Sequence, residues 1–173
     1  INKNIKILAG GSLELAIGFV ESFYPTQEKY NEGVDLVSAN ITRDNPESKI
    51  WHDDYKDNIK NIVKKNNAFE GLLVNNEGLV TEGSKSNIFF IKDECIITPD
   101  LGILPGITRR YVQAAIEDLG YKIIPDELSL EDAYKMDQAF LTGTSLNILP
   151  IRTIDKTKYP IKTEIMDKLI EEF

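Results

Sequence analysis

The sequence predicts a mixed α/β fold built around one large domain. Short apolar segments bounded by turn residues alternate along the chain with segments whose apolar residues recur at helical spacing. Two pairs of the apolar segments are separated by turns of only two or three residues, which is typical of antiparallel hairpins. The chain has 173 residues, 42% of them hydrophobic and 28% charged, and is therefore long enough to bury a core of this kind.

The N-terminal residues predict a small unit distinct from the remainder of the chain. Residues 4–10 and 15–23 have the pattern of two strands that are joined through a Gly-Gly turn. The chain opens with Ile1, in a segment typical of a strand inside a folded domain. We therefore expect residues 1–23 to be the end of an N-terminal small domain whose remainder is absent, and the chain to be incomplete.

The next segment has the composition of a linker. Residues 24–33 are polar and contain Pro25, which is typical of a connection between domains. Residues 34–173 are then expected to form the larger, C-terminal domain.

Strands and helices are interleaved in this larger domain. The pairs expected as hairpins turn at residues 76–78 and 93–94. Ser129 and Asp132 resemble a capping box, with aspartate in place of the usual glutamate, and predict the start of a short helix. The expected strands cover residues 34–41, 69–75, 79–83, 87–92, 95–99, 121–128 and 138–145, and the expected helices residues 55–66, 108–119, 129–134 and 161–173.

The charge and the cysteine count exclude several classes of function. A net charge of −8 argues against a surface for nucleic acid or anionic lipid, because such a surface must neutralise phosphates. We expect a small-molecule partner instead. No apolar run approaches the length of a membrane span, and no signal pattern opens the chain. Cys95 is the only cysteine and cannot form an internal disulfide, so a reducing, cytoplasmic setting is expected.

Three polar clusters interrupt the regular elements: residues 81–87 (TEGSKSN), 105–110 (PGITRR) and 142–147 (TGTSLN). In the second cluster, Ile107 and Thr108 are placed where the first amides of a helix have no intrahelical partner, which predicts an anion site suited to phosphate. The alternative is that Thr108 only caps its own helix.

In the third cluster, Gly143 allows close approach to the backbone, and Thr144 and Ser145 offer hydroxyl groups. The alternative for this cluster is an ordinary loop. Two loops suited to phosphate favour a phosphorylated ligand without identifying it.

Glu82 narrows the choice of ligand. A carboxylate at a strand end among small residues could hold a protonated ring nitrogen, which a pyridinium cofactor needs in order to accept electrons. Such a cofactor also needs a lysine. Lys49 precedes the apolar pair Ile50 and Trp51, a context that lowers the pKa of an amine by desolvation. Lys85 is the rival, but in an extended strand its side chain would lie on the opposite face from Glu82.

The motifs that carry this chemistry resemble those of the class IV pyridoxal-phosphate aminotransferases. This family includes branched-chain aminotransferases, D-amino acid aminotransferases and 4-amino-4-deoxychorismate lyases. The resemblance runs from about Val34 to the C-terminus, and the TEGSxSN and LPGITR motifs are specific when they occur together. It is carried by SKIWHDDYKDNI, AFEGLLVNNEGLVTEGSKSNIFFIK, ITPDLGILPGITRRYVQAAIEDLG and AFLTGTSLNILPI.

The resemblance implies a site for pyridoxal 5'-phosphate. Lys49 matches the catalytic lysine that forms a Schiff base with the cofactor, and Glu82 matches the glutamate that faces the pyridine nitrogen. Leu104 matches a residue that packs on the ring. The residues implied to hold the phosphate are Ile107, Thr108, Gly143 and Thr144. No metal is expected.

The resemblance also implies the fold, the partners and the reaction. The expected fold is the C-terminal pseudo-barrel domain of a fold type IV enzyme, and the expected assembly is a homodimer. The expected reaction is transamination between an amino acid, branched-chain or otherwise aliphatic, and a 2-keto acid. The alternatives are an aminodeoxychorismate lyase and an inactive C-terminal domain fragment.

The chain departs from the family in two places. The family usually supplies a phosphate-binding arginine from its N-terminal domain, which we expect to be largely absent here. Near Lys49 the chain has His52 and Tyr55, where branched-chain enzymes commonly have an asparagine-tyrosine pair. Tyr55 is offset by one position from the family tyrosine, and His52 is left without a role.

Overall fold

The computed structural model describes residues 3–10, 14–43, 45–48 and 53–173. The predicted mixed α/β fold is confirmed. The helices are α1 (Gln27–Glu32), α2 (Asp53–Lys65), α3 (Ile107–Asp118), α4 (Leu130–Ala133) and α5 (Glu164–Glu172). The strands are β1 (Lys3–Ala9), β2 (Leu15–Glu21), β3 (Val34–Asn40), β4 (Glu70–Val74), β5 (Leu79–Gly83), β6 (Asn87–Lys92), β7 (Cys95–Thr98), β8 (Lys122–Pro125), β9 (Leu128–Ser129), β10 (Gln138–Gly143), β11 (Asn147–Ile154) and β12 (Thr157–Lys158).

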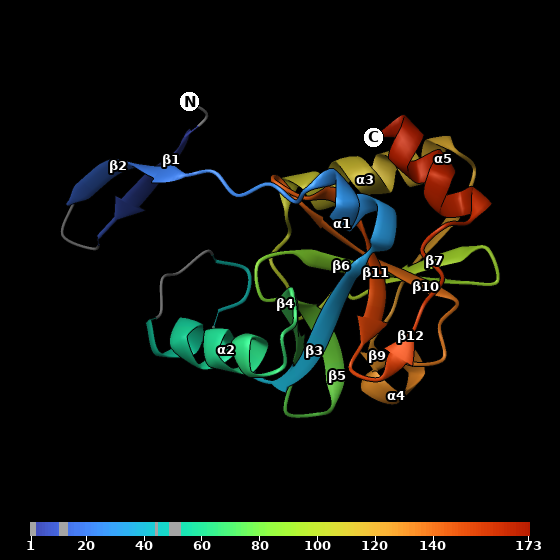
Figure 1. Ribbon diagram of the computed structural model, residues 1–173, viewed down its shortest axis with the longest axis horizontal. Helices are drawn as coiled ribbons and strands as arrows, with labels where there is room; N and C mark the ends of the chain where they lie inside the picture. Colours follow the sequence, from blue (N-terminus) through green and yellow to red (C-terminus); the bar gives the residue numbers. More distant parts are fainter. Residues whose placement is uncertain (1–2, 11–13, 44, 49–52) are drawn as a thin grey trace.

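Strands β1 and β2 form an antiparallel hairpin of their own, which extends away from the main body (Figure 1). The cross-strand register pairs Ile5 with Phe19 and Ile7 with Ile17, and all four side chains are exposed. The strands expected within residues 1–23 are therefore confirmed.

The segment predicted as a linker contains α1. This helix follows Thr26 and ends at Gly33, whose φ of 72° is the left-handed conformation that glycine adopts at low cost. Tyr30 anchors the helix, because its hydroxyl donates a hydrogen bond to the carbonyl oxygen of Leu146 at 3.0 Å. Part of the segment expected to be a linker is thus ordered as a helix.

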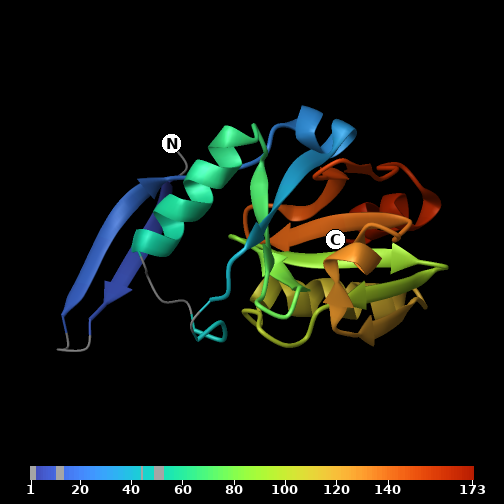
Figure 2. The same ribbon diagram turned by 90° about the horizontal axis from the view of Figure 1, so that it is seen from below.

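The remaining strands that the structure describes form one ten-stranded curled sheet. Its order is β8-β7-β6-β10-β11-β3-β4-β5-β9, with β12 paired to β11. Figure 2 shows β3 and β4 running at a steep angle to β6 and β10, so that the sheet curls around the core as a half-barrel. This curl is the part of the fold that the family resemblance implied.

Strand β11 joins the two halves of the sheet and was not predicted. Its first half pairs antiparallel with β10, up to the pair of Phe140 with Pro150. Its second half pairs parallel with β3, starting at Ile151 with Val34. Proline lacks the amide that a central strand normally donates. Pro150 is tolerated here because it lies where β11 changes partners.

Alternation of side chains along the strands divides the core into two main layers. Phe90 and Leu141 face the inside of the curl. Phe89 and Phe140 face outwards, stack with ring centroids 5.1 Å apart, and are covered by α3 and α5. Helix α2 packs on β3 and β4 through a smaller cluster. The two layers fix the ends of β6, β10 and α3 relative to one another.

Candidate functional site

The structure brings the three polar clusters of the sequence together at one place. Asn87 is the link between them. It is the first residue of β6, and it lies opposite Thr142 of β10 in the cross-strand register. Its side-chain amide donates a hydrogen bond to the carbonyl oxygen of Leu104, 2.8 Å away, just before the first turn of α3. The three clusters, which lie far apart in the sequence, therefore meet at one edge of the half-barrel.

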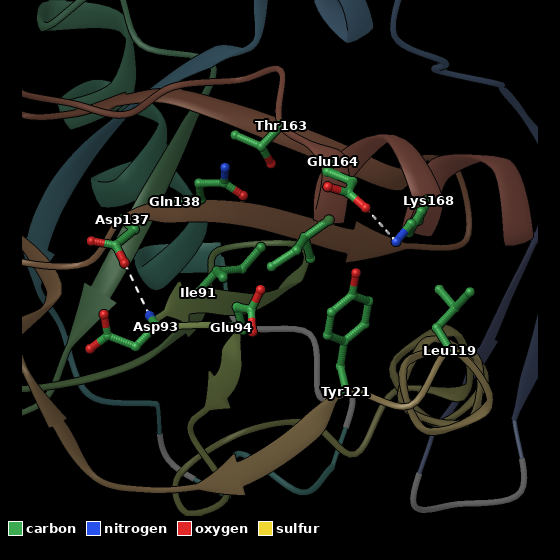
Figure 3. Close-up of a pocket in the computed structure, with 11 residues that line it drawn as sticks. Ile91, Asp93, Glu94, Leu119, Tyr121, Asp137, Gln138, Thr163, Glu164 and Lys168 are labelled. Atoms are coloured by element: carbon green, nitrogen blue, oxygen red, sulfur yellow. Dashed lines mark hydrogen bonds and ion pairs between the residues drawn. The ribbon is translucent and has the colours of Figure 1, made fainter.

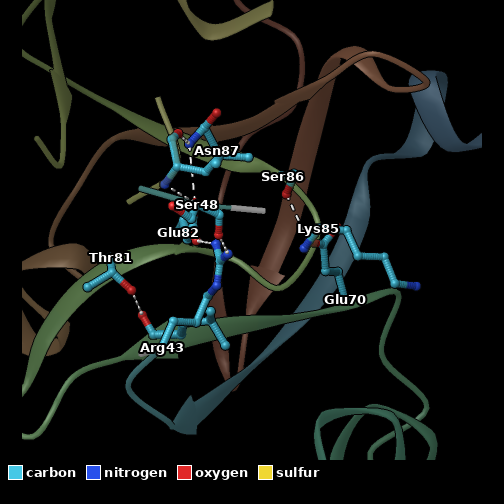
Figure 4. A network of polar contacts seen from close by, with 10 residues as sticks. Arg43, Ser48, Glu70, Thr81, Glu82, Lys85, Ser86 and Asn87 are labelled. Carbon is cyan, nitrogen blue, oxygen red and sulfur yellow. Dashed lines mark hydrogen bonds and ion pairs between the residues drawn. The ribbon is translucent and has the colours of Figure 1, made fainter. Parts of the chain in front are cut away.

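Glu82 is the buried carboxylate of this site. It lies next to the end of β5, and only 2% of its surface is exposed. Its Oε2 accepts hydrogen bonds from the backbone amide of Leu104 at 2.8 Å and from the side-chain amide of Asn87 at 3.4 Å (Figure 4). Burial raises the pKa of Glu82, although the Leu104 amide and Arg43 act in the opposite direction. The carboxylate is therefore well placed to favour a cationic partner.

Arg43 supplies a cation to Glu82 in this structure. Its guanidinium forms an ion pair with Oε1 of Glu82 and donates a second hydrogen bond to the carbonyl oxygen of Ser48 at 3.1 Å. Sequence reasoning missed Arg43, because it lies in a polar stretch after β3 that gave no sign of a buried partner. The contact ties Ser48, the residue before Lys49, to Glu82 through one side chain.

The structure describes only one of the two candidate lysines. Lys49 lies outside the described residues, as do Trp51 and His52, and the side chain of Tyr55 is likewise not described. Lys85 is described, and its side chain is exposed and points away from Glu82 (Figure 4). Lys85 is thus directed away from Glu82 as expected, but residues 84–86 form a bend and not the extended strand that was assumed.

The N-terminus of α3 has the features of an anion site. The N-cap residue is Gly106, and no described side chain caps the helix. The alternative in which Thr108 caps its own helix is therefore wrong, because Thr108 lies inside the first turn. That turn contains no acidic residue, so its free amides and the helix dipole favour an anion.

Glycine at position 106 also leaves space beside Asn87. A Cβ atom built on Gly106 would lie 2.5 Å from Oδ1 of Asn87. The backbone of Gly106 has a φ of −62°, which any residue can adopt. The requirement for glycine is therefore one of close packing at the site, not of backbone conformation.

Arg109 holds the first turn of α3 against the preceding loop. It is 6% exposed, and its guanidinium donates a hydrogen bond to the carbonyl oxygen of Pro99 at 2.9 Å and contacts the Asp100 carboxylate at 3.4 Å. Burial lowers the pKa of Arg109. Sequence analysis did not single out this residue, which braces the loop that carries Leu104.

The third polar cluster, residues 142–147, contains the turn between β10 and β11. The amide of Leu146 donates a hydrogen bond to the carbonyl oxygen of Gly143 at 2.9 Å, and Thr144 is exposed. A Cβ atom on Gly143 would make only ordinary contacts, the nearest at 3.6 Å from Leu146. The turn itself does not require glycine at this position, so the missing side chain leaves the backbone accessible.

Thr142, just before this turn, has a buried hydroxyl group without a partner. The residue is 1% exposed, and its Oγ1 forms no hydrogen bond with any residue that the structure describes. By strand alternation its side chain lies on the same face as Phe140, which is the face covered by α3. A buried hydroxyl normally has a partner, so the site lacks a hydrogen-bonding group at this position.

These features fit a ligand that has a cationic ring and an anionic group. Glu82 is a buried carboxylate for the ring, while the uncapped end of α3 and the unpaired Thr142 hydroxyl suit a phosphate. Asn87 and Leu104 connect the two ends by the hydrogen bonds described above. The residues present therefore fit pyridoxal 5'-phosphate.

A separate surface cavity of about 610 Å³ lies at the other end of β6 and β10 (Figure 3). It is lined by Ile91, Asp93, Gln138, Tyr121 and Glu164, among others. Asn87 and Thr142 lie at the opposite ends of these strands. We assign the candidate site to the polar cluster around Glu82 and not to this cavity, because only the former joins a buried charge to an uncapped helix end.

Comparison with known proteins identifies the family. The model of the family described as amino-transferase class IV matches residues 6–154. The chain belongs to this family. The family resemblance deduced from the sequence motifs is thus confirmed, and the half-barrel is the corresponding part of the class IV fold.

Relatives within the class IV family include two kinds of enzyme. The branched-chain-amino-acid aminotransferase of Pseudomonas aeruginosa is 39% identical over 92 residues, which are 53% of this chain and 30% of the relative. The aminodeoxychorismate lyase of Bacillus subtilis is 33% identical over 125 residues, which are 69% of this chain and 43% of the relative. The chain thus spans less than half the length of these class IV relatives.

A solved class IV structure is that of the T.th. branched-chain amino acid aminotransferase with pyridoxamine 5'-phosphate. It matches with a TM-score of 0.77 and 26% sequence identity, covering 91% of this chain and 56% of the other. Among the residues that the structure of the present chain describes, no helix could cross a membrane, and no cluster of His, Cys, Asp or Glu could hold a metal ion.

Proposed function

We propose that this class IV chain binds pyridoxal 5'-phosphate and serves an aminotransferase reaction between an amino acid, branched-chain or otherwise aliphatic, and a 2-keto acid. The observation that carries the proposal is the connection of Glu82 to the uncapped end of α3 through Asn87 and Leu104. A cation site and an anion site joined in this way suit the two ends of this cofactor. The branched-chain relatives named above support the substrate class.

Each candidate residue has a distinct role in binding the cofactor. Lys49 binds the cofactor covalently. Glu82 faces the ring nitrogen, and Leu104 packs on the ring. The phosphate is held by Ile107, Thr108, Gly143 and Thr144.

The cofactor, when bound, withdraws electrons from the substrate carbon that bears the amino group. Glu82, a buried anion, stabilises positive charge at the ring nitrogen, and Asn87 and Leu104 hold its carboxylate in place. The amine of Lys49, once released, moves a proton at the substrate α-carbon. The first turn of α3 orients the phosphate without taking part in proton transfer.

The organisation of the whole protein is part of the same proposal. Residues 1–23 are the end of an N-terminal small domain, residues 24–33 connect it, and residues 34–173 are the cofactor-binding domain. We propose a cytoplasmic homodimer. The separate β1–β2 hairpin, with its exposed apolar side chains, supports a division after residue 23.

A lyase function is the second candidate. It is favoured by the Bacillus subtilis relative, an aminodeoxychorismate lyase whose match covers 69% of this chain. Both functions would use the same cofactor and the same lysine. A third possibility is a domain fragment that binds the cofactor without turnover.

The test is the visible absorption spectrum of the protein with added pyridoxal 5'-phosphate, followed by borohydride reduction and peptide mapping. We expect a visible band and a label on Lys49, with Lys49→Ala abolishing both and Lys85→Ala, the exposed control, changing neither. A label on Lys85 or scattered over several lysines would contradict the proposal.

Assays of the labelled protein then separate the candidates. Amino transfer from leucine to a 2-keto acid supports the aminotransferase, and pyruvate release from aminodeoxychorismate supports the lyase. Cofactor binding with neither activity supports the fragment.

A further inference from the structure

Glu70, the first residue of β4, is a second buried carboxylate near the candidate site. Only 3% of its surface is exposed. Its Oε1 accepts two hydrogen bonds, from the backbone amide of Lys85 at 2.6 Å and from the hydroxyl of Ser86 at 2.9 Å (Figure 4). Both donors belong to the bend at residues 84–86, so one carboxylate oxygen of β4 holds the middle of this bend.

The chain is packed closely around this carboxylate. A Cβ atom on Gly83 would lie 2.6 Å from Oε1 of Glu70 and would also collide with the Ser86 hydroxyl. The amide of Ser84 donates a hydrogen bond to the carbonyl oxygen of Gly71 at 2.9 Å. All three residues of the bend are therefore bound to the start of β4 by hydrogen bonds.

The two ends of the same bend carry Glu82 and Asn87. Both residues bind the backbone of Leu104, Glu82 through the amide at 2.8 Å and Asn87 through the carbonyl at 2.8 Å. The separation between Glu82 and Asn87 depends on the shape of residues 83–86. Glu70 contacts two residues of this segment, Lys85 and Ser86, by the hydrogen bonds given above.

Burying a carboxylate is unfavourable unless hydrogen bonds compensate it. A structural role in β4 alone would be served equally well by an apolar residue. Both hydrogen bonds that Glu70 accepts come from the bend at residues 84–86.

We propose that Glu70 is a positioning residue for the cofactor site, which holds the bend at residues 84–86 so that the carboxylate of Glu82 faces the cofactor ring. The proposal rests on the proposed function, because it gives Glu82 the role of ring partner. Glu70 itself does not contact the cofactor.

The test compares four variants loaded with pyridoxal 5'-phosphate: Glu70→Ala, Glu70→Gln, Ser86→Ala and Glu77→Gln. Glu77 is an exposed residue of the β4–β5 turn and serves as the control. The measurements are cofactor affinity and the pH midpoint of the visible absorption of the bound cofactor. This midpoint reports the environment of the ring and would not respond to a general loss of stability.

A displaced catalytic group typically reduces function by up to about 100-fold, and we expect Glu70→Ala to weaken cofactor binding by roughly 10-fold and to shift the pH midpoint. Glu70→Gln should restore both, because a single amide oxygen can accept both hydrogen bonds. Ser86→Ala removes only one of the two bonds and should give an intermediate effect. Glu77→Gln should match the wild type.

The outcomes distinguish this proposal from the proposed function. If the wild-type protein does not bind the cofactor, the proposed function fails, and this inference fails with it. If the wild type binds but Glu70→Ala and Ser86→Ala have unchanged affinity and midpoint, only the positioning role is overturned. If Glu70→Ala does not fold, Ser86→Ala decides the question, since it keeps the bond from Lys85.

Discussion

Asn87 and Thr142 lie opposite each other in the register of β6 and β10, but of these two side chains only that of Asn87 has hydrogen-bond partners among the described residues. Asn87 reaches Leu104 and Glu82, whereas the hydroxyl of Thr142 is buried and unpaired. A buried polar group without a partner lowers stability, and a bound ligand can supply the missing partner.

We therefore predict that Thr142→Val weakens cofactor binding without lowering the stability of the fold. The change removes an unpaired hydroxyl and keeps the shape, so the free energy of unfolding should stay the same or rise by about 1 kcal/mol. Affinity for pyridoxal 5'-phosphate should fall. Chemical denaturation and a binding titration measure the two effects.

Thr98→Val is the matched control. The hydroxyl of Thr98 is equally buried and donates a hydrogen bond to the carbonyl oxygen of Ile88 at 2.9 Å. Its loss should lower the free energy of unfolding by about 1 to 2 kcal/mol and leave cofactor affinity unchanged. If Thr142→Val is as destabilising as Thr98→Val, the hydroxyl of Thr142 has a protein partner and is not reserved for a ligand.

A second prediction concerns the space beside Gly106. In Gly106→Ala, the new Cβ would approach Oδ1 of Asn87 to 2.5 Å and displace that side chain from Leu104. We expect clearly weaker cofactor binding and a loss of about 1 to 3 kcal/mol in the free energy of unfolding, as is usual for overpacking. Gly18→Ala, in β2, introduces a Cβ with no atom within 4 Å and should change neither quantity. Equal cofactor affinity in both variants would argue that Asn87 does not shape the site.

The local features of the fold could be predicted from the sequence, because short-range rules determine them. The turn at residues 76–78 contains Gly78 with a φ of 80°, and Ser129 caps the short helix as predicted, accepting a hydrogen bond from the amide of Asp132 at 3.0 Å. The helix expected to stop at Gly120 does so, with a φ of 82° there. Each of these outcomes depends on residues within one or two turns of chain.

Features that depend on distant partners could not be predicted. Strand β11 contains Pro150, which argues against a central strand unless it is known that the strand changes partners at this residue. In the site, the sequence indicated Glu82 but not Arg43, which lies 39 positions away and meets it only in the folded chain. The roles of Glu70 and Arg109 were missed for the same reason.

A third prediction follows from the buried carboxylate of Glu70. Burial raises its pKa above the ordinary value of 4.5. Above pH 4.5 the unfolded chain releases this proton before the folded chain does, so the contribution of Glu70 to stability falls as pH rises through its folded pKa. We expect Glu70→Gln to become more stable relative to the wild type as pH rises from 4.5 through the folded-state pKa of Glu70. Urea unfolding at several pH values measures this difference, and a difference independent of pH would contradict it.

The last prediction concerns the ion pair between Arg43 and Glu82, whose side chains are 18% and 3% exposed. Arg43→Gln leaves a buried carboxylate without its cation, whereas in Glu82→Gln the more exposed guanidinium can turn towards solvent. Arg43→Gln should therefore be the more destabilising single change. The double variant should lose less stability than the sum of the two, with a coupling of about 1 to 3 kcal/mol.

The ion pair between Arg43 and Glu82 should also change how stability depends on pH. Arg43 acts to lower the pKa of Glu82, so its removal raises that pKa further above the ordinary value of 4.5. The folded state of Arg43→Gln then retains its proton to a higher pH, and the loss of stability in this variant relative to the wild type should grow as pH rises through the folded-state pKa of Glu82. A double-mutant cycle at two pH values measures both effects. Additive losses, equal at both pH values, would show that Arg43 does not neutralise Glu82 in solution, and the carboxylate would then have only the Leu104 amide and Asn87 as described partners.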